Sequence, residues 1–408
     1  FYEMIAGHRR RLASSLAEMS TLPCIIRNLT DDEAVIIMVD SNLQRENLLP
    51  SEKGFAYKMK LEEFQKDKQK TVFAAGMVML EVAACLLLAR LVLPYIMDLF
   101  PALDEFTEDL VSTVIFDFMV QILALLVIPF LIYKFYLKKS TKEVLYMSNV
   151  RRTDARIYIL SFLLGIVAVI LTMYVSTVWQ TMLAMFGYDI SSSSPMPDKF
   201  QLWHLLLMIL LTAVLPAICE EFTNRGIFLS AMRSCFSETA TILIGGIAFG
   251  LFHQYITQTF YTALMGMLLT YLVLKTRSII PAAIVHFTNN FISVIMNFAT
   301  TYLQSDPFTF IINLVTSSAL FNFLVLAVSV ALLVVLLYYI NRIYGKYYTG
   351  NYAEYLKTGD AKYLNNVACY WNTGDVKYVM SNREKVCYFG AIAVTAVYTV
   401  FTFIWGLY

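Results

Sequence analysis

The chain has 408 residues, of which 58% are hydrophobic, and its mean hydropathy is +0.62. Soluble domains contain about 45–50% apolar residues, so this composition excludes an ordinary soluble protein and indicates a polytopic membrane protein. The net charge of +1 points to no charged partner, and the six cysteines contain no CxxC pair, which argues against a zinc ribbon or a disulfide framework.

Residues 1–70 are the polar part of the chain and predict a small cytoplasmic segment with an α/β-like fold. We expect a helix up to Met19, a short strand at residues 23–27 and a helix start at residues 31–33. The chain begins at Phe1 and not at a methionine, so we expect it to come from a longer reading frame.

Two arginine-containing segments lie in this polar part, Gly7-His8-Arg9-Arg10 and Asn42-Leu43-Gln44-Arg45, and Pro50-Ser51-Glu52 follows them. Together they resemble the N-terminal domain of ParB-type partition proteins, in which such segments bind nucleotide phosphates. Guanidinium groups suit this task because their fork of donors matches phosphate oxygens. The first strands of that domain would precede Phe1, and no helix-turn-helix follows Lys70. We therefore expect a fused remnant without a nucleic-acid partner; nucleotide binding is the alternative.

From residue 71 onward the sequence predicts an all-α transmembrane bundle of about nine spans. A helix needs about 20 apolar residues to cross a ~30 Å hydrocarbon core. The expected spans are residues 71–97, 110–137, 157–186, 202–221, 239–257, 260–274, 279–302, 308–340 and 386–408.

The basic residues of the loops predict the orientation of this bundle. Cytoplasmic loops carry an excess of lysine and arginine. With the N-terminus in the cytoplasm, the basic residues of 138–156 and 342–385 lie inside, as do those between the later spans. The acidic loop 98–109 and the serine-rich loop 191–197 then lie outside.

The expected domains are the segment 1–70, the bundle 71–341 with a catalytic core at about 200–300, the linker 342–385 and a final helix, 386–408. The linker contains a short imperfect repeat, residues 358–364 and 373–379. Its Gly-Asp pairs mark turns. We interpret it as a solvated linker; a docking patch for a substrate or partner is the alternative.

Three charged residues, Glu220, Glu221 and Arg225, end the apolar stretch that begins at residue 202. Charged groups in membrane helices are rare, face the bundle interior and usually mark function. Glu221 and Arg225 are one helical turn apart and predict an ion pair. Glu220 points about 100° away and is free to act as a general base. Two solvated glutamates at a cytoplasmic helix end are the simpler alternative.

A first histidine motif, Phe249-xxx-His253, follows in apolar sequence. Gly245, Gly246 and Gly250 lie in the same stretch and favour close helix packing. A lone histidine of this kind is more often a core residue than a catalyst, so its meaning depends on the other motifs.

A second histidine motif, His286-xxx-Asn290, lies near the start of the seventh expected span. The two residues are four apart and share one face of a helix. This spacing suits two donors aimed at one oxygen, or two ligands of one metal. Asn289 is the geometric alternative to Asn290.

The ordered set EExxxR, FxxxH and HxxxN resembles the CPBP family of intramembrane proteases, the CAAX protease and bacteriocin-processing family, also called Abi. The resemblance covers about residues 200–300. It implies that Glu220 and His253 activate a water molecule, while His286 and Asn290 stabilise the oxyanion of the scissile carbonyl. The family often has a glycine in the turn that Lys275-Thr-Arg-Ser-Ile279 forms here, and Arg277 takes its place.

Glu221, Arg225 and Phe249 take supporting roles in this interpretation, and no cofactor is required. The alternative is a divalent metal such as zinc, for which Glu220, His253 and His286 would be the ligands. The asparagine in the second histidine motif fits an oxyanion hole better than a zinc site.

The resemblance thus predicts an intramembrane endopeptidase in a bacterial cell membrane, acting on a membrane-associated peptide or protein in peptide maturation or bacteriocin immunity. A non-proteolytic membrane scaffold or immunity protein with the same fold is the alternative. A transporter is disfavoured, because the two halves of the chain show no recognisable paired repeats.

Overall fold

The structure is a computed structural model that describes residues 4–26, 34, 37–38, 50–188, 199–302, 319–358 and 378–405. The chain divides into two compact units, Phe1–Thr71 and Val72–Tyr408. The first contains α1 (His8–Leu16) and the beginning of α3 (Pro50–Met97). Proline at the start of α3 suits a helix, since the first N–H groups have no partner within the helix.

The strand expected at residues 23–27 is not formed where the structure describes it. Residues 21–26 are exposed and have no regular secondary structure. A strand needs a neighbour to satisfy its backbone groups, and the described part of this unit offers none. The helix start at residues 31–33 and the segment Asn42–Arg45 lie outside the described residues.

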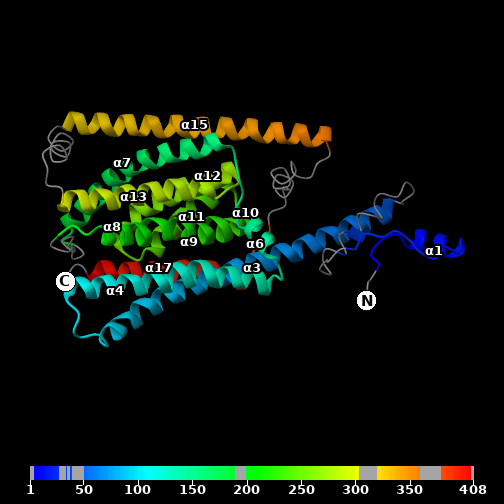
Figure 1. The fold of residues 1–408 in the computed structure, drawn as a ribbon, viewed down its shortest axis with the longest axis horizontal. Helices are drawn as coiled ribbons and strands as arrows, with labels where there is room; N and C mark the ends of the chain where they lie inside the picture. Colours follow the sequence, from blue (N-terminus) through cyan, green and yellow to red (C-terminus); the bar gives the residue numbers. More distant parts are fainter. Residues whose placement is uncertain are drawn as a thin grey trace. The chain divides into compact units, whose positions relative to one another are not determined.

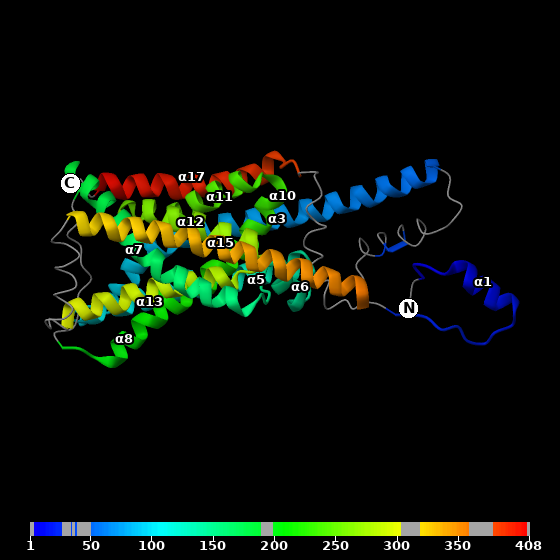
Figure 2. The same ribbon diagram turned by 90° about the horizontal axis from the view of Figure 1, so that it is seen from above.

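The second unit is a bundle in which the described residues form eight helices that are long and apolar enough to cross a membrane (Figures 1 and 2). Four of them are α7 (Ala155–Met185), α12 (Ile256–Thr276), α13 (Ile280–Tyr302) and α17 (Asn382–Trp405). Two more are α3 and α15 (Ala319–Thr358). The other two, Glu105–Tyr136 and Leu202–Cys235, are built from several segments each.

The fifth expected span, residues 239–257, corresponds to the short apolar helix α11 (Glu238–Phe252). Its 15 residues give a length of about 22 Å at 1.5 Å per residue, less than the ~30 Å hydrocarbon core. The chain turns directly after it, at His253–Tyr255. His253 is therefore the first residue of this turn.

Two helix ends differ from the sequence-based expectation. The helix that carries Glu220 does not end at Glu221 but continues to Cys235. Its polar residues are buried inside the bundle, so they do not mark a solvated end. Likewise α15 runs on to Thr358, so the expected linker begins as helix. Residues 359–377, with most of the repeat, lie outside the described part.

Both segmented helices contain wide π-helical turns directly before a proline. The Glu105–Tyr136 helix consists of α4 (Glu105–Asp117), η1 (Phe118–Val127), α5 (Ile128–Leu131) and η2 (Ile132–Tyr136). The Leu202–Cys235 helix consists of α8 (Leu202–Met208), η3 (Ile209–Val214), α9 (Leu215–Glu220), η4 (Glu221–Phe228) and α10 (Leu229–Cys235). Pro129 and Pro216 follow η1 and η3. Proline lacks the N–H group and clashes with the preceding turn, which a widened turn relieves.

Glycines allow α11 and α12 to pack closely. A Cβ on Gly246 would lie 2.7 Å from the carbonyl oxygen of Ala263, and one on Gly250 would lie 2.5 Å from that of Thr259. Real Cβ atoms do not approach backbone this closely. The glycines predicted to favour close packing therefore do so, and this contact brings Phe249 and His253 of α11 against α12.

The turn between α12 and α13 explains why a glycine is common at the position of Arg277. Arg277 has φ +56° and ψ +25°, the left-handed conformation at the C-terminal end of α12. Glycine adopts this conformation without a Cβ clash. The arginine is accommodated, and the following Ile279 N–H and Ser278 hydroxyl donate to the carbonyls of Asn149 and Arg151.

Candidate active site

Glu221, Arg225 and His286 form the buried centre of the second unit. Glu221 is fully buried and Arg225 is 1% exposed. Arg225 Nη1 donates to Glu221 Oε1 at 2.8 Å, and His286 Nδ1 lies 2.9 Å from the same oxygen. Because a carboxylate accepts only, Nδ1 of His286 carries the hydrogen. The expected Glu221–Arg225 ion pair is present, and Glu221 also orients His286 on another helix.

Glu220, the neighbouring carboxylate, has a different environment. Its Oε1 accepts a hydrogen bond from Gln121 Nε2 at 2.8 Å. Its Oε2 has no hydrogen-bond partner and lies 4.0 Å from His286 Nε2. The two adjacent glutamates point in different directions, as the helix geometry predicts: Glu221 binds Arg225 and His286 through Oε1, whereas Glu220 is half-buried and bonded to Gln121. Oε2 has no hydrogen-bond partner in either glutamate.

His253 lies at the end of α11, where its Nδ1 is 2.9 Å from the carbonyl oxygen of Phe249. A carbonyl accepts only, so Nδ1 donates and Nε2 of the neutral ring is left as an acceptor. Phe249 joins the groups of the site. The Arg225 guanidinium lies 4.1 Å from the Phe249 ring centroid, and the rings of His253 and His286 meet its edges at centroid distances of 4.9 Å and 5.9 Å.

Asn290 connects α13 to the proline-interrupted helix of Glu220. Its Nδ2 donates to the carbonyl of Thr212 at 2.9 Å. This carbonyl lies four residues before Pro216 and is the one that the missing proline N–H leaves without a helical partner. Asn289 donates to Asn290 Oδ1 at 3.0 Å and so fixes the direction of the amide. An amide nitrogen has two hydrogens, so one is left for another acceptor.

The same arrangement occurs at Pro129. The Thr223 hydroxyl donates to the carbonyl of Leu125, which lies four residues before that proline, at 2.5 Å. Gln121, the partner of Glu220, lies one turn earlier on the same segment. Each proline therefore frees a backbone acceptor that a polar side chain from a neighbouring helix takes up, and these bonds fix the helices around Glu220.

Glu220, His253, His286 and Asn290 all line one cavity of about 860 Å³. The structure thus brings the four sequence-predicted residues to one space, from three different helical segments. Asn289, the geometric alternative to Asn290, lines the cavity too, as does Arg90. Other polar residues of the wall were not singled out from the sequence; among them are Asp109, Asp117, Thr172, Tyr255, Gln258 and Tyr261. Asp117 and Gln121, four residues apart in an apolar stretch, were the available signal for the Gln121 contact.

The buried centre contains charges of both signs. Two carboxylates, Glu220 and Glu221, face one permanent cation, Arg225. Asp117 and Arg90 line the same cavity as Glu220, and buried charges persist only when they are paired. Glu220, His253 and His286 have the chemistry of zinc ligands. In the part of the chain that the structure describes, however, no three His, Cys, Asp or Glu side chains are placed to hold one metal ion.

This fold and site define a polytopic membrane protein with a buried glutamate–arginine–histidine centre at a polar cavity. Residues 202–292 match the family described as "Type II CAAX prenyl endopeptidase Rce1-like". Residues 1–43 match the ParB N-terminal domain. The chain therefore carries an Rce1-like domain of the CPBP family and a ParB N-terminal domain, which confirms both resemblances.

The curated relatives match the N-terminal region. The chain is 36% identical over 90 residues to "Probable chromosome-partitioning protein ParB" of Pseudomonas putida, which covers 22% of this chain and 31% of that protein. It is 47% identical over 62 residues to "Nucleoid occlusion protein" of Listeria monocytogenes, covering 15% and 22%. The chain spans less than a third of the length of these relatives. No solved structure matches the chain significantly.

Proposed function

We propose that the second unit is an intramembrane peptidase in which Glu220 activates the attacking water. One observation carries this proposal: Glu220 lines the polar cavity and its Oε2 has no hydrogen-bond partner, whereas Glu221 is fully buried, binds Arg225 and His286 through Oε1 and is not part of the cavity wall. A carboxylate that is to take a proton from water needs such a free oxygen in reach of the reaction space.

In the proposed reaction, Glu220 takes a proton from water as the water oxygen attacks the peptide carbonyl. His253, with Nε2 as acceptor, shares the binding of this water. The proton then passes to the leaving nitrogen as the C–N bond breaks, which gives one new carboxyl end and one new amine end. Polar groups around the cavity admit water and a peptide backbone to membrane depth, where lipid-exposed polar groups are not tolerated.

Two donors are proposed for the oxyanion, His286 Nε2 and the second hydrogen of Asn290 Nδ2. His286 can donate at Nε2 only as an imidazolium, because Nδ1–H is directed to Glu221. Donors fixed in advance in a dry site are worth about 10²–10³ in rate each.

The proposal uses no metal, because the hydrogen bonds described account for the fixed positions of all four residues. Its substrate is a membrane-associated peptide or protein, and no nucleic-acid partner is proposed for the N-terminal domain. The cavity is lined by residues 109–117 of α4, the second half of α7 and the turn between α11 and α12. These segments lie at the end of the bundle opposite the basic loop 138–156, so substrate access is proposed from the side away from the cytoplasm.

The test is cleavage of a peptide library by the purified protein in detergent, with metal content measured in parallel. We expect His253→Ala to abolish cleavage and Asn290→Ala to raise the barrier by about 2.7–4 kcal/mol, the loss of one oxyanion donor. Chelators should have no effect. Cleavage that requires one equivalent of bound zinc would overturn the metal-free mechanism, and a wild-type protein that cleaves no peptide while binding one would favour a non-proteolytic scaffold.

A further inference from the structure

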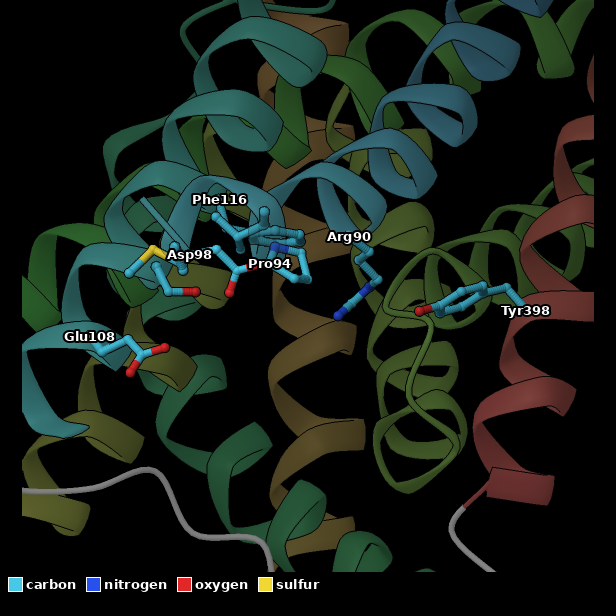
Figure 3. Close-up of a pocket in the computed structure, with 9 residues that line it drawn as sticks. Arg90, Pro94, Asp98, Glu108, Phe116 and Tyr398 are labelled. Atoms are coloured by element: carbon cyan, nitrogen blue, oxygen red, sulfur yellow. The ribbon is translucent and has the colours of Figure 1, made fainter. Parts of the chain in front are cut away.

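Arg90 of α3 is a second charged group inside the bundle, and it is not part of the glutamate–arginine–histidine centre. It lines the catalytic cavity and also an adjoining cavity of about 430 Å³ (Figure 3). The two cavities share Arg90, Leu93, Ser112 and Phe116 in their walls. Arg90 therefore lies where the smaller cavity meets the catalytic one.

The guanidinium of Arg90 is held in place by neutral groups. Its Nε donates to Gln254 Oε1 at 2.7 Å, and its Nη1 donates to the Tyr255 hydroxyl at 2.6 Å. Gln254 is fully buried. The guanidinium also lies 4.4 Å from the ring centroid of Tyr255 and 5.2 Å from that of Phe116. These contacts fix the direction of the cation without neutralising it.

Arg90 makes no ion pair with any carboxylate in the described residues, although the membrane-spanning segment makes an unpaired cation costly. Asp98 and Glu108 line the smaller cavity too. Both are exposed, and neither is within ion-pair distance of the guanidinium. A held cation that faces a cavity and has neutral partners is a binding site for an anion of the ligand.

We propose that Arg90 is a substrate subsite that binds a carboxylate of the peptide, at a distance from the scissile bond. This rests on the proposed peptidase function. A planar carboxylate can take two parallel hydrogen bonds from a guanidinium, and its single charge meets less repulsion from Asp98 and Glu108 than a phosphate dianion would. The carboxylate is supplied either by the C-terminus of the peptide or by an acidic side chain.

The experiment compares matched peptides on the wild-type protein. In the first pair, one peptide has a free C-terminus and the other an amidated C-terminus. In the second set of pairs, a single position carries Glu in one peptide and Gln in the other, and each position is tested in turn. We expect one of these neutralisations to raise KM about tenfold or more, because it removes a charged hydrogen bond to Arg90. The value of kcat should be largely retained. The pair that responds identifies the source of the carboxylate.

Arg90→Gln should remove the discrimination, so that both members of the responding pair have the same KM. The matched control is Arg156→Gln, which removes an exposed arginine at the start of α7. This variant should still discriminate between the two peptides of the pair. Binding of the same peptides to Glu220→Gln protein tests the subsite without any cleavage, so failure of the peptidase proposal is recognised separately. The subsite proposal would be overturned if the wild-type protein bound the charged and the neutral peptide of every pair equally. It would also be overturned if the Arg90→Gln variant still discriminated between them.

Discussion

Arg225 and Arg90 both lie inside the bundle and donate to polar groups, but the chemistry of their partners differs. Arg225 is 1% exposed, pairs with Glu221 and donates to the carbonyl of Gly266 at 3.3 Å. Arg90 is held by Gln254 and Tyr255, which are neutral, and it borders two cavities. In the first arrangement the cation fixes the groups of the proposed active site, whereas in the second its charge is left for the proposed ligand.

The largest expected effect comes from removing each cation in turn. Arg225→Met leaves the buried Glu221 with His286 as its remaining partner, and breaking a buried ion pair in this way costs about 3–5 kcal/mol. Arg90→Met removes two hydrogen bonds to the neutral groups of Gln254 and Tyr255 and leaves no buried carboxylate without its cation, so its cost should be smaller. Thermal unfolding of both variants in the same detergent checks this order. If the Arg90 variant were less stable than the Arg225 variant, Arg90 and not Arg225 would have the structural role.

A smaller loss of stability is expected at Asn290, which donates to the carbonyl of Thr212 in the helix that also carries Arg225. Asn290→Ala leaves the carbonyl of Thr212 without its donor, at a cost of about 1–3 kcal/mol. Pro216→Ala restores an N–H group that can take that carbonyl, so the stability cost of Asn290→Ala should fall in the Pro216→Ala background.

The double-mutant cycle separates the two roles of Asn290. Stability should show a coupling of about 0.5–3 kcal/mol between the two sites. The loss of cleavage caused by Asn290→Ala should persist in the Pro216→Ala background, because it reports the hydrogen given to the oxyanion. Recovery of activity together with stability would show that Asn290 acts only by fixing the helix.

The sequence predicted the parts of the site that depend on helical spacing. The Glu221–Arg225 pair is one turn apart, and the different directions of Glu220 and Glu221 follow from the 100° step between neighbours. The positions of most spans were also predictable from apolar length. The exceptions are the fifth, which is the short helix α11, and the fourth, which continues past Glu221 to Cys235. The contacts between distant helices were not. The polar pair Asp117 and Gln121 stands out in an apolar stretch, but the local sequence does not indicate that Gln121 would bind Glu220 or that His286 would bind Glu221.

The roles of the prolines also required the structure. Pro129 and Pro216 are visible in the sequence, but which side chains take the carbonyls they free depends on how the helices pack. The helix of Glu220 was expected to end near Glu221, because charged residues in an apolar stretch resemble a membrane boundary. It continues to Cys235 because those charges are paired inside the bundle.

The most direct test of the central claim is a pair of isosteric substitutions, Glu220→Gln and Glu221→Gln, assayed for both kcat and Tm. Glu220→Gln should lower kcat by about 10³-fold, within the range for loss of a general base, and leave Tm unchanged. Glu221→Gln should lower Tm, since it weakens the bonds to Arg225 and His286. Full activity in Glu220→Gln, or a loss of cleavage in Glu221→Gln as large as that in Glu220→Gln at unchanged Tm, would contradict the division between the two glutamates.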